Sequence, residues 1–206
     1  MDIETLIPCF NILGGLLYLP PEDESLKPVF NVFSDPGWIS SWPCGSKTAL
    51  QEIDRLIQQA PHEPKDLVPA YYELFGTEED KAHLKAPPWG SVYIDSERTA
   101  FGRSTQELRE FLDDQQIGLN QEREEPEDHI GLLLLTAAWM GIAKREKAFD
   151  ILLKIYILPW APTYLALLGT VAPHPFYKAI ADLTLLTLEE TREARHIDAE
   201  QVKIHQ

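Results

Sequence analysis

The longest apolar stretch of the chain runs over residues 130–143, where Thr136 is the one polar side chain. A helix that is hydrophobic on every side is normally buried on every side. At 1.5 Å per residue the stretch spans roughly 21 Å, which is short of the ~30 Å hydrocarbon core of a bilayer. The pattern therefore predicts the central helix of a soluble all-helical domain, with no stable insertion into a membrane.

Apolar residues also recur at helical spacing on both sides of this stretch. The periodicity predicts helices over residues 3–19, 22–33, 49–59, 65–75, 104–115, 146–157 and 176–195, and residues 163–171 form a further apolar stretch. Gly14 and Gly15 weaken the first helix by about 1 kcal/mol each relative to alanine, or they mark a close helix crossing. Only residues 91–94 have an extended pattern. The chain is thus predicted to be all-α, a single globular domain over residues 1–206 with roughly nine to eleven helices around the buried central one.

Boundary signals refine this picture. Two residue pairs have the spacing of N-terminal capping boxes: Thr48 with Gln51, and Ser104 with Glu107. An aromatic loop is expected where Trp38 and Trp42 precede Pro43. Residues 197–206 are polar and are a candidate for a disordered tail.

A short acidic segment, residues 125–129, precedes the central helix and ends in a histidine. Pro126 suits the first position of a helix, and Glu127 and Asp128 suit its positive N-terminal dipole. The acids therefore have a sufficient structural explanation as a helix start. The alternative is that they line a polar mouth of the core and carry the function, and the pattern alone leaves both explanations open.

A second unusual segment lies at residues 86–93 and contains two consecutive prolines, Pro87 and Pro88. The prolines exclude a helix and hold the backbone extended. Gly90 permits a turn directly after the Trp89 indole. An aromatic side chain on so stiff a loop is either a plug over the core or one wall of a binding groove.

The balance of charge narrows the choice of partner. The chain has 18 basic and 33 acidic residues, which gives a net charge of −15. A nucleic acid is not expected as a partner, because phosphates attract basic surfaces and no Lys/Arg cluster is present. An anionic membrane surface is disfavoured for the same reason. The charge either serves solubility alone or speeds the association of cationic partners.

Cysteines and the start of the chain indicate the compartment. Cys9 and Cys44 make neither a disulfide framework nor a zinc site, and are expected as ordinary thiols in a reducing environment. The first residues lack the positive region of a signal peptide. We therefore expect a cytoplasmic protein.

Motifs of catalysis are largely missing: the sequence has no Walker loop, no G-x-G-x-x-G, no G-x-S-x-G and no H-E-x-x-H. A metal-dependent hydrolase that uses Glu125, Asp128 and His129 is one hypothesis, since the first and last stand four residues apart. Metal sites need three or four converging ligands and supporting hydrogen bonds, and the other histidines lie in turns or near the end. A peptide-binding site asks only for an apolar aromatic groove with acids nearby, suited to a ligand with apolar and basic residues.

Three segments together carry a resemblance to a known family. They are Tyr-Tyr-Glu-Leu-Phe at residues 71–75, Pro-Pro-Trp-Gly-Ser-Val-Tyr at 87–93 and Glu-Pro-Glu-Asp-His at 125–129. In order and spacing they resemble the TorD/DmsD family of redox-enzyme maturation chaperones, and its DmsD members most closely. The resemblance spans nearly the whole chain. It implies an all-helical cytoplasmic protein that is not an enzyme and needs no cofactor.

The resemblance also implies a ligand. Members of the family bind the twin-arginine leader peptide of the catalytic subunit of a molybdenum oxidoreductase, typically of the dimethyl sulfoxide reductase type. They hold the precursor back from export until cofactor insertion and folding are complete. Components of the export translocase are a further candidate partner. The residues that match the family's leader-contact positions are Tyr71, Leu74, Phe75, Pro87, Pro88, Trp89, Tyr93, Gly102, Asp128 and His129.

The side-chain chemistry agrees with such a ligand. An arginine guanidinium donates two hydrogen bonds to a carboxylate such as Asp128 or Glu125, and stacks on an aromatic ring such as Trp89. The apolar part of the leader is then expected to form a helix in a groove lined by Leu74 and Phe75.

Overall fold

The apolar stretch in the middle of the chain forms α8 (Ile130–Ile142), and the other helices are arranged about it. The computed structural model describes residues 1–76, 84–118 and 125–205. Within these ranges it has eleven α-helices and no strand, which confirms the all-α prediction. Besides α8, the helices are α1 (Ile3–Tyr18), α2 (Lys27–Ser34), α3 (Trp38–Ser41), α4 (Lys47–Ile57), α5 (Pro64–Phe75), α6 (Ser91–Ile94), α7 (Arg103–Asp114), α9 (Glu146–Ile151), α10 (Ala161–Val171) and α11 (Pro175–Ala194).

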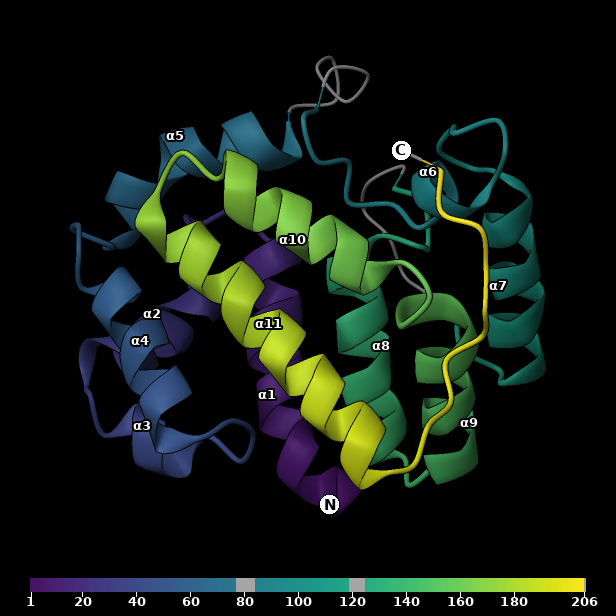
Figure 1. Cartoon of the computed structure of the whole chain (residues 1–206), viewed down its shortest axis with the longest axis horizontal. Coiled ribbons are helices and arrows are strands. Elements are labelled where there is room, and N and C mark those ends of the chain that lie inside the picture. Colours follow the sequence, from purple (N-terminus) through teal and green to yellow (C-terminus); the bar gives the residue numbers. More distant parts are fainter. Residues whose placement is uncertain (77–83, 119–124, 206) are drawn as a thin grey trace.

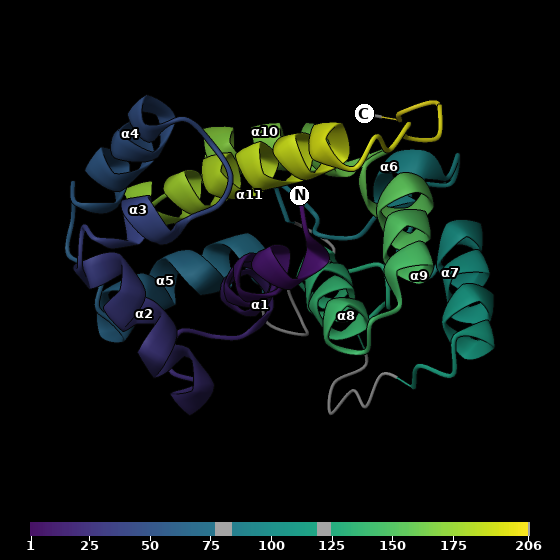
Figure 2. The same ribbon diagram turned by 90° about the horizontal axis from the view of Figure 1, so that it is seen from below.

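Two layers of helices cross in the centre of the molecule (Figure 1). α1 lies beside α8 in one layer, and the hairpin of α10 and α11 crosses over them in the other (Figure 2). α2 to α5 flank this centre on one side, whereas α6, α7 and α9 flank it on the other. One continuous hydrophobic core joins the layers, and its largest fully buried side chains include Trp160, Tyr164, Phe10, Phe149 and Phe176.

α1 and α8 meet at two glycines. A Cβ on Gly14 would lie 2.9 Å from the carbonyl oxygen of Gly131, and a Cβ on Gly131 would lie 2.9 Å from the carbonyl oxygen of Gly14. The two backbones are therefore in direct contact, which confirms a close helix crossing at Gly14. The crossing lies at the start of α8, so it also fixes the preceding acidic segment against the end of α1.

α8 is not buried on all sides, in contrast to the prediction. Its first half is inaccessible, with Ile130, Leu133 and Leu134 at most 1% exposed. Trp139 and Ile142, near its other end, are 41% and 60% exposed. The helix thus runs from the core to the surface, and the buried end is the one that follows the acidic segment.

Both predicted capping boxes are wrong. Ser46, not Thr48, caps α4 by accepting a hydrogen bond from a backbone N–H of the first turn. At α7 the cap comes from outside the helix, because the Asp95 carboxylate accepts from the N–H and the hydroxyl of Ser104 at 3.1 and 3.0 Å. Glu107 forms a surface ion pair instead of the reciprocal bond of a capping box.

Three further segments differ from their predictions. Trp38 opens the short helix α3 rather than an aromatic loop, and residues 91–94 form α6 rather than extended chain. α8 starts at Ile130, so Pro126 is not its first residue and the acids before it lie outside its first turn. At the first residues of α6 and α8 the backbone N–H bonds to a group distant in sequence, and spacing alone does not reveal such contacts.

The C-terminal tail, a candidate for disorder, follows a defined path through residue 205. The Glu200 N–H donates to the carbonyl of Lys154 at 3.0 Å, and the His205 N–H donates to the carbonyl of Tyr93 at 2.8 Å. The tail therefore runs from the end of α11 along α9 to α6 (Figure 1). Backbone hydrogen bonds hold it, and the polarity of its side chains does not reveal them.

In the described part of the chain, no single helix is both long and apolar enough to cross a bilayer. The segments Glu146–Ile157 and Ala161–Val171 meet the requirements of length and composition only as a pair, and a bend of 60° separates them. The first of these segments consists of α9 and the π-helical turns of Leu152–Ile157 that follow it.

Candidate peptide-binding site

The Pro–Trp loop (residues 86–90) and the acidic segment (residues 125–129) form one local structure. Two backbone hydrogen bonds join them: Gly90 N–H to Asp128 O at 3.2 Å, and Ile130 N–H to Pro88 O at 2.8 Å. Between these bonds Trp89 stands opposite His129 in an isolated antiparallel bridge. The loop thereby satisfies the first N–H of α8, which has no partner within its own helix. Two of the three segments that carry the family resemblance are thus in direct contact.

Trp89 is held over the core rather than at the surface. Trp89 is only 4% exposed, and its indole N–H donates a hydrogen bond to Glu125 Oε1 at 2.7 Å. Glu125 is itself only 7% exposed. Of the two interpretations of Trp89, the structure favours the plug: the indole is buried and binds a buried carboxylate.

Trp89→Phe is therefore expected to destabilise the protein. The variant keeps a ring over the core but removes the N–H that binds the buried Glu125 carboxylate, which costs about 1–3 kcal/mol of unfolding free energy. Trp139→Phe is the matched control, because Trp139 is 41% exposed, and we expect a change within about 0.5 kcal/mol. Urea unfolding of both variants measures the difference, and equal stabilities would contradict the plug.

The Asp128 carboxylate caps the N-terminus of α6 rather than that of α8. Its Oδ2 accepts a hydrogen bond at 2.6 Å from the N–H of Ser91, the first residue of α6. Among the described residues, Oδ1 and the hydroxyls of Ser91 and Thr105 make no hydrogen bond. Burial raises the pKa of Asp128, and the hydrogen bond from the Ser91 N–H offsets part of this rise. The carboxylate thus keeps unused acceptor capacity at the centre of the site.

His129 is the N-cap of α8. Its Nδ1 accepts a hydrogen bond from the Gly131 N–H at 3.1 Å, so this nitrogen carries no proton in that contact. The imidazole lies against the rings of Tyr18, Phe75 and Trp89, with centroid distances of 5.3, 6.4 and 6.5 Å. Aromatic side chains from α1, α5 and the Pro–Trp loop therefore converge on one histidine.

The aromatic stripe of α5 points into the core. Tyr71, Leu74 and Phe75 are all at most 6% exposed. The Tyr71 hydroxyl donates to the carbonyl of Tyr18 at 2.6 Å, and the Phe75 ring packs against Tyr71 and Tyr177. The expectation of a groove lined by Leu74 and Phe75 is therefore wrong for this structure. Their contact with a leader stays a prediction that requires movement of the site.

Tyr93 and Gly102 have mainly structural contacts. The Tyr93 ring stacks on Trp160 at 5.6 Å, and burial raises the pKa of its hydroxyl. A Cβ on Gly102 would collide with the Asp95 carboxylate that caps α7. Gly102 thus makes room for that cap, which explains the residue without assigning it a contact with a ligand.

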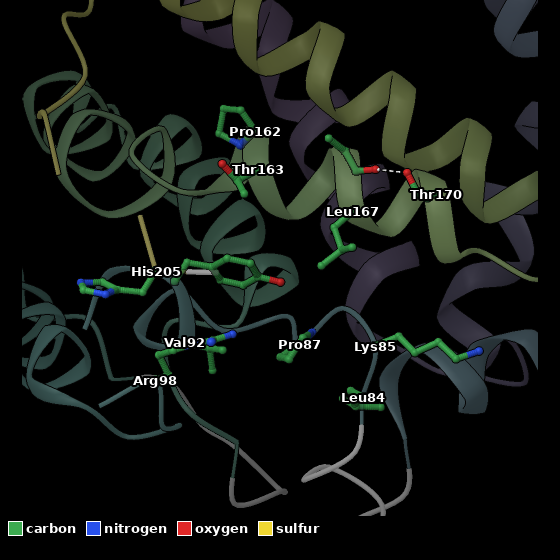
Figure 3. A pocket seen from close by; sticks show the side chains of 12 residues that line it. Leu84, Lys85, Pro87, Val92, Arg98, Pro162, Thr163, Leu167, Thr170 and His205 are labelled. Carbon is green, nitrogen blue, oxygen red and sulfur yellow. Dashed lines mark hydrogen bonds between the residues drawn. The ribbon is translucent and has the colours of Figure 1, made fainter. Parts of the chain in front are cut away.

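An open groove of about 780 Å³ lies beside this site, and we call it the α10 groove (Figure 3). Residues of the Pro–Trp loop and α6 face residues of α10 across it, and the tail reaches one end. Its lining includes Pro87, Val92, Tyr93, Ala166, Leu167 and His205. Of the predicted site residues, only Pro87 and Tyr93 line it. None of the site residues predicted from the sequence lies on α10, whose one signal is a row of residues at four-residue spacing: Pro162, Ala166 and Thr170.

The metal hypothesis finds no support in this geometry. In the ranges described, no three side chains of His, Cys, Asp or Glu are placed to hold one ion. Glu125 binds the Trp89 indole, Asp128 binds the start of α6, and His129 caps α8 through the nitrogen nearest its backbone. Each of the three proposed ligands is thus committed to a separate structural contact.

Comparison with known proteins identifies relatives over most of the chain. The family model described as nitrate reductase delta subunit matches residues 41–166. The chain is 35% identical over 179 residues to the Tat proofreading chaperone DmsD of Salmonella typhi, covering 87% of this chain and 85% of the relative. It is 34% identical over 196 residues to the probable Tat proofreading chaperone DmsD of Haemophilus influenzae, covering 94% and 93%.

A more distant relative extends the similarity beyond the DmsD proteins. The chaperone protein YcdY of Escherichia coli (strain K12) is 28% identical over 176 residues, covering 84% of this chain and 86% of the relative. The relatives carry the names of chaperones, not of enzymes, which agrees with the expectation of a protein without catalytic activity.

Proposed function

This chain belongs to the nitrate reductase delta subunit family, within its TorD/DmsD chaperones, and from this premise we propose that it is a chaperone for a twin-arginine leader peptide. The proposed client is the precursor of a molybdenum oxidoreductase of the dimethyl sulfoxide reductase type. By holding the leader in the cytoplasm, the chaperone delays export until the cofactor is inserted and the client is folded. Translocase components are a second proposed partner, at which the client is handed over.

One observation supports this proposal above the others. The segments at residues 71–75, 87–93 and 125–129 are separate in sequence, but the rings of Phe75 and Trp89 both lie against His129. A helix end, a proline loop and an acidic segment thus build one aromatic and acidic cluster. Such a cluster offers carboxylates to guanidinium groups and rings on which they stack.

The contacts of the cluster also account for reversible binding. Trp89 and Asp128 are engaged with the protein itself, so an incoming leader must replace these contacts. Ordering a flexible peptide costs several kcal/mol more. Both costs lower the affinity, and a moderate affinity suits a chaperone that has to release its client.

Calorimetric titration tests the proposal. The probe is a synthetic leader with two adjacent arginines followed by its apolar stretch, and the control is the same peptide with both arginines changed to lysine. We expect saturable binding that the lysine peptide weakens roughly tenfold or more, because lysine keeps the charge but lacks the planar fork of guanidinium. The affinity should also fall as salt rises. Absence of binding, or equal binding of both peptides, would refute recognition of the arginine pair.

A further inference from the structure

The wall of the α10 groove is one continuous helical face. Pro162, Ala166 and Thr170 follow each other at four-residue spacing, which places them in a row along α10. The row spans about 12 Å at 1.5 Å per residue. Figure 3 shows Leu167 of this helix pointing toward the Pro–Trp loop, whereas the Thr170 hydroxyl donates to the Ala166 carbonyl of its own helix. An apolar helical segment of two to three turns matches such a wall in length and shape.

The opposite wall connects the groove to the proposed leader site. Pro87 and Tyr93 line the groove, and between them in sequence Trp89 reaches back to Glu125. A peptide that engages the acidic segment therefore passes directly to the groove. Continuity of this kind favours one ligand for both places over two separate ligands.

Charge separates the two places. The chain carries a net charge of −15, yet among the described residues no carboxylate lines the groove. Its charged lining consists of Arg98 and of Lys85, which pairs with Glu73 at 3.1 Å, so the described lining offers no carboxylate to an incoming arginine. The acidic segment next to it attracts arginines. Arginines and apolar residues of one leader are thus directed to different ends of the same site.

We propose, on the premise of the leader-binding function, that the α10 groove is the docking site of the apolar stretch of the leader. That stretch packs as a helix along Pro162, Ala166 and Thr170, while its arginine pair lies at the acidic segment. α10, which carries none of the residues of the family resemblance named above, is then the surface that reads the apolar half of the client's leader. The difference in charge between the acidic segment and the α10 groove then sets the direction in which the leader lies in the site.

A charge-reversal pair at Ala166 tests this inference. Ala166 is exposed on α10, and glutamate and lysine are both good helix formers, so the variants should fold. We expect Ala166→Glu and Ala166→Lys each to weaken binding of the arginine-containing leader roughly tenfold, because either charge must be buried against an apolar peptide. The heat-capacity change of binding should become less negative in both, since less apolar surface is buried.

The controls separate the possible failures. Ala194→Glu and Ala194→Lys change an exposed alanine at the far end of α11 and should leave affinity unchanged. Should the Ala166 variants bind as wild type does, the docking site is elsewhere and leader binding itself stands. If glutamate strengthens binding and lysine weakens it, the arginines enter the groove and the inference is overturned.

If wild type does not bind the leader, the proposed function fails as well. Thr170→Glu and Thr170→Lys repeat the test should either Ala166 variant unfold.

Discussion

Asp128→Asn should remove most leader binding and leave the protein at least as stable as wild type. Asparagine has the same shape, and its side-chain oxygen can keep the bond from the Ser91 N–H. Its NH₂ group adds a donor beside the hydroxyls of Ser91 and Thr105, which have no hydrogen-bond partner among the described residues. What the variant loses is the charge that pairs with a guanidinium, and we expect affinity to fall about a hundredfold. Calorimetry and urea unfolding measure the two effects.

The pH dependence follows from the direction of the pKa shift. Burial raises the pKa of Asp128 in the folded state, so folding takes up a proton at pH values between about 4 and the raised pKa. The stability from this acid is therefore greatest at low pH and is lost as the pH rises through the folded pKa. The Asp128→Asn variant has no acid at this position, so its unfolding free energy does not fall with pH for this reason. Its advantage over wild type in unfolding free energy should grow from pH 4 towards neutrality.

Leader binding shifts the same proton in the opposite direction. A guanidinium stabilises the ionised carboxylate, so binding at Asp128 releases a proton and wild-type affinity rises with pH. The variant should show no such rise. Asp113→Asn, an exposed carboxylate on α7, is the charge control. An equal loss of affinity in this control would mean that only net charge is read, and unfolding of Asp128→Asn with unchanged binding per folded molecule would make Asp128 purely structural.

Gly14→Ala should cost about 3 kcal/mol of unfolding free energy or more. Helix propensity alone favours the alanine by about 1 kcal/mol. The new methyl, however, would lie 2.9 Å from the Gly131 carbonyl oxygen and from the Leu135 backbone nitrogen. Backbone atoms cannot rotate away as a side chain does, so α1 and α8 must separate and their shared packing is lost. Steric repulsion is expected to exceed the gain in propensity.

Gly169→Ala is the matched control, which measures the gain in helix propensity without a steric clash. Gly169 also lies inside a helix, but a Cβ there would meet nothing closer than the Asp182 carboxylate at 3.6 Å, an ordinary contact. We expect this variant to be stabilised by about 0.5–1 kcal/mol. Thermal and urea unfolding of the two variants side by side isolate the crossing. Two variants of similar stability would contradict direct backbone contact between α1 and α8.

The features that the sequence predicts well are those set by local periodicity. The apolar run of α8 identifies the central helix, and the glycine pair of α1 offers a close helix crossing as one of two explanations, without its partner. The family resemblance identifies the segments that meet at His129. In all these cases the information lies within a few consecutive residues.

The features that the sequence does not predict depend on which groups come together in space. Asp95 caps α7, and Asp128 caps α6, although each acid is distant in sequence from the N–H groups that it binds. The burial of Phe75 and the groove along α10 likewise result from the packing of whole helices. A spacing rule assigns a carboxylate to the nearest helix, whereas the fold assigns it to the nearest unsatisfied donor.

The tail gives the groove a native reporter. The amide proton of His205 bonds to the Tyr93 carbonyl, and Tyr93 and His205 both line the α10 groove. Its exchange with solvent deuterium is therefore governed by the opening of this one contact rather than by global unfolding. A ligand that presses the tail onto α6 slows this exchange, and one that lifts the tail accelerates it. A single amide, followed without any substitution, thus distinguishes a peptide that is clasped from one that displaces the chain's own residues.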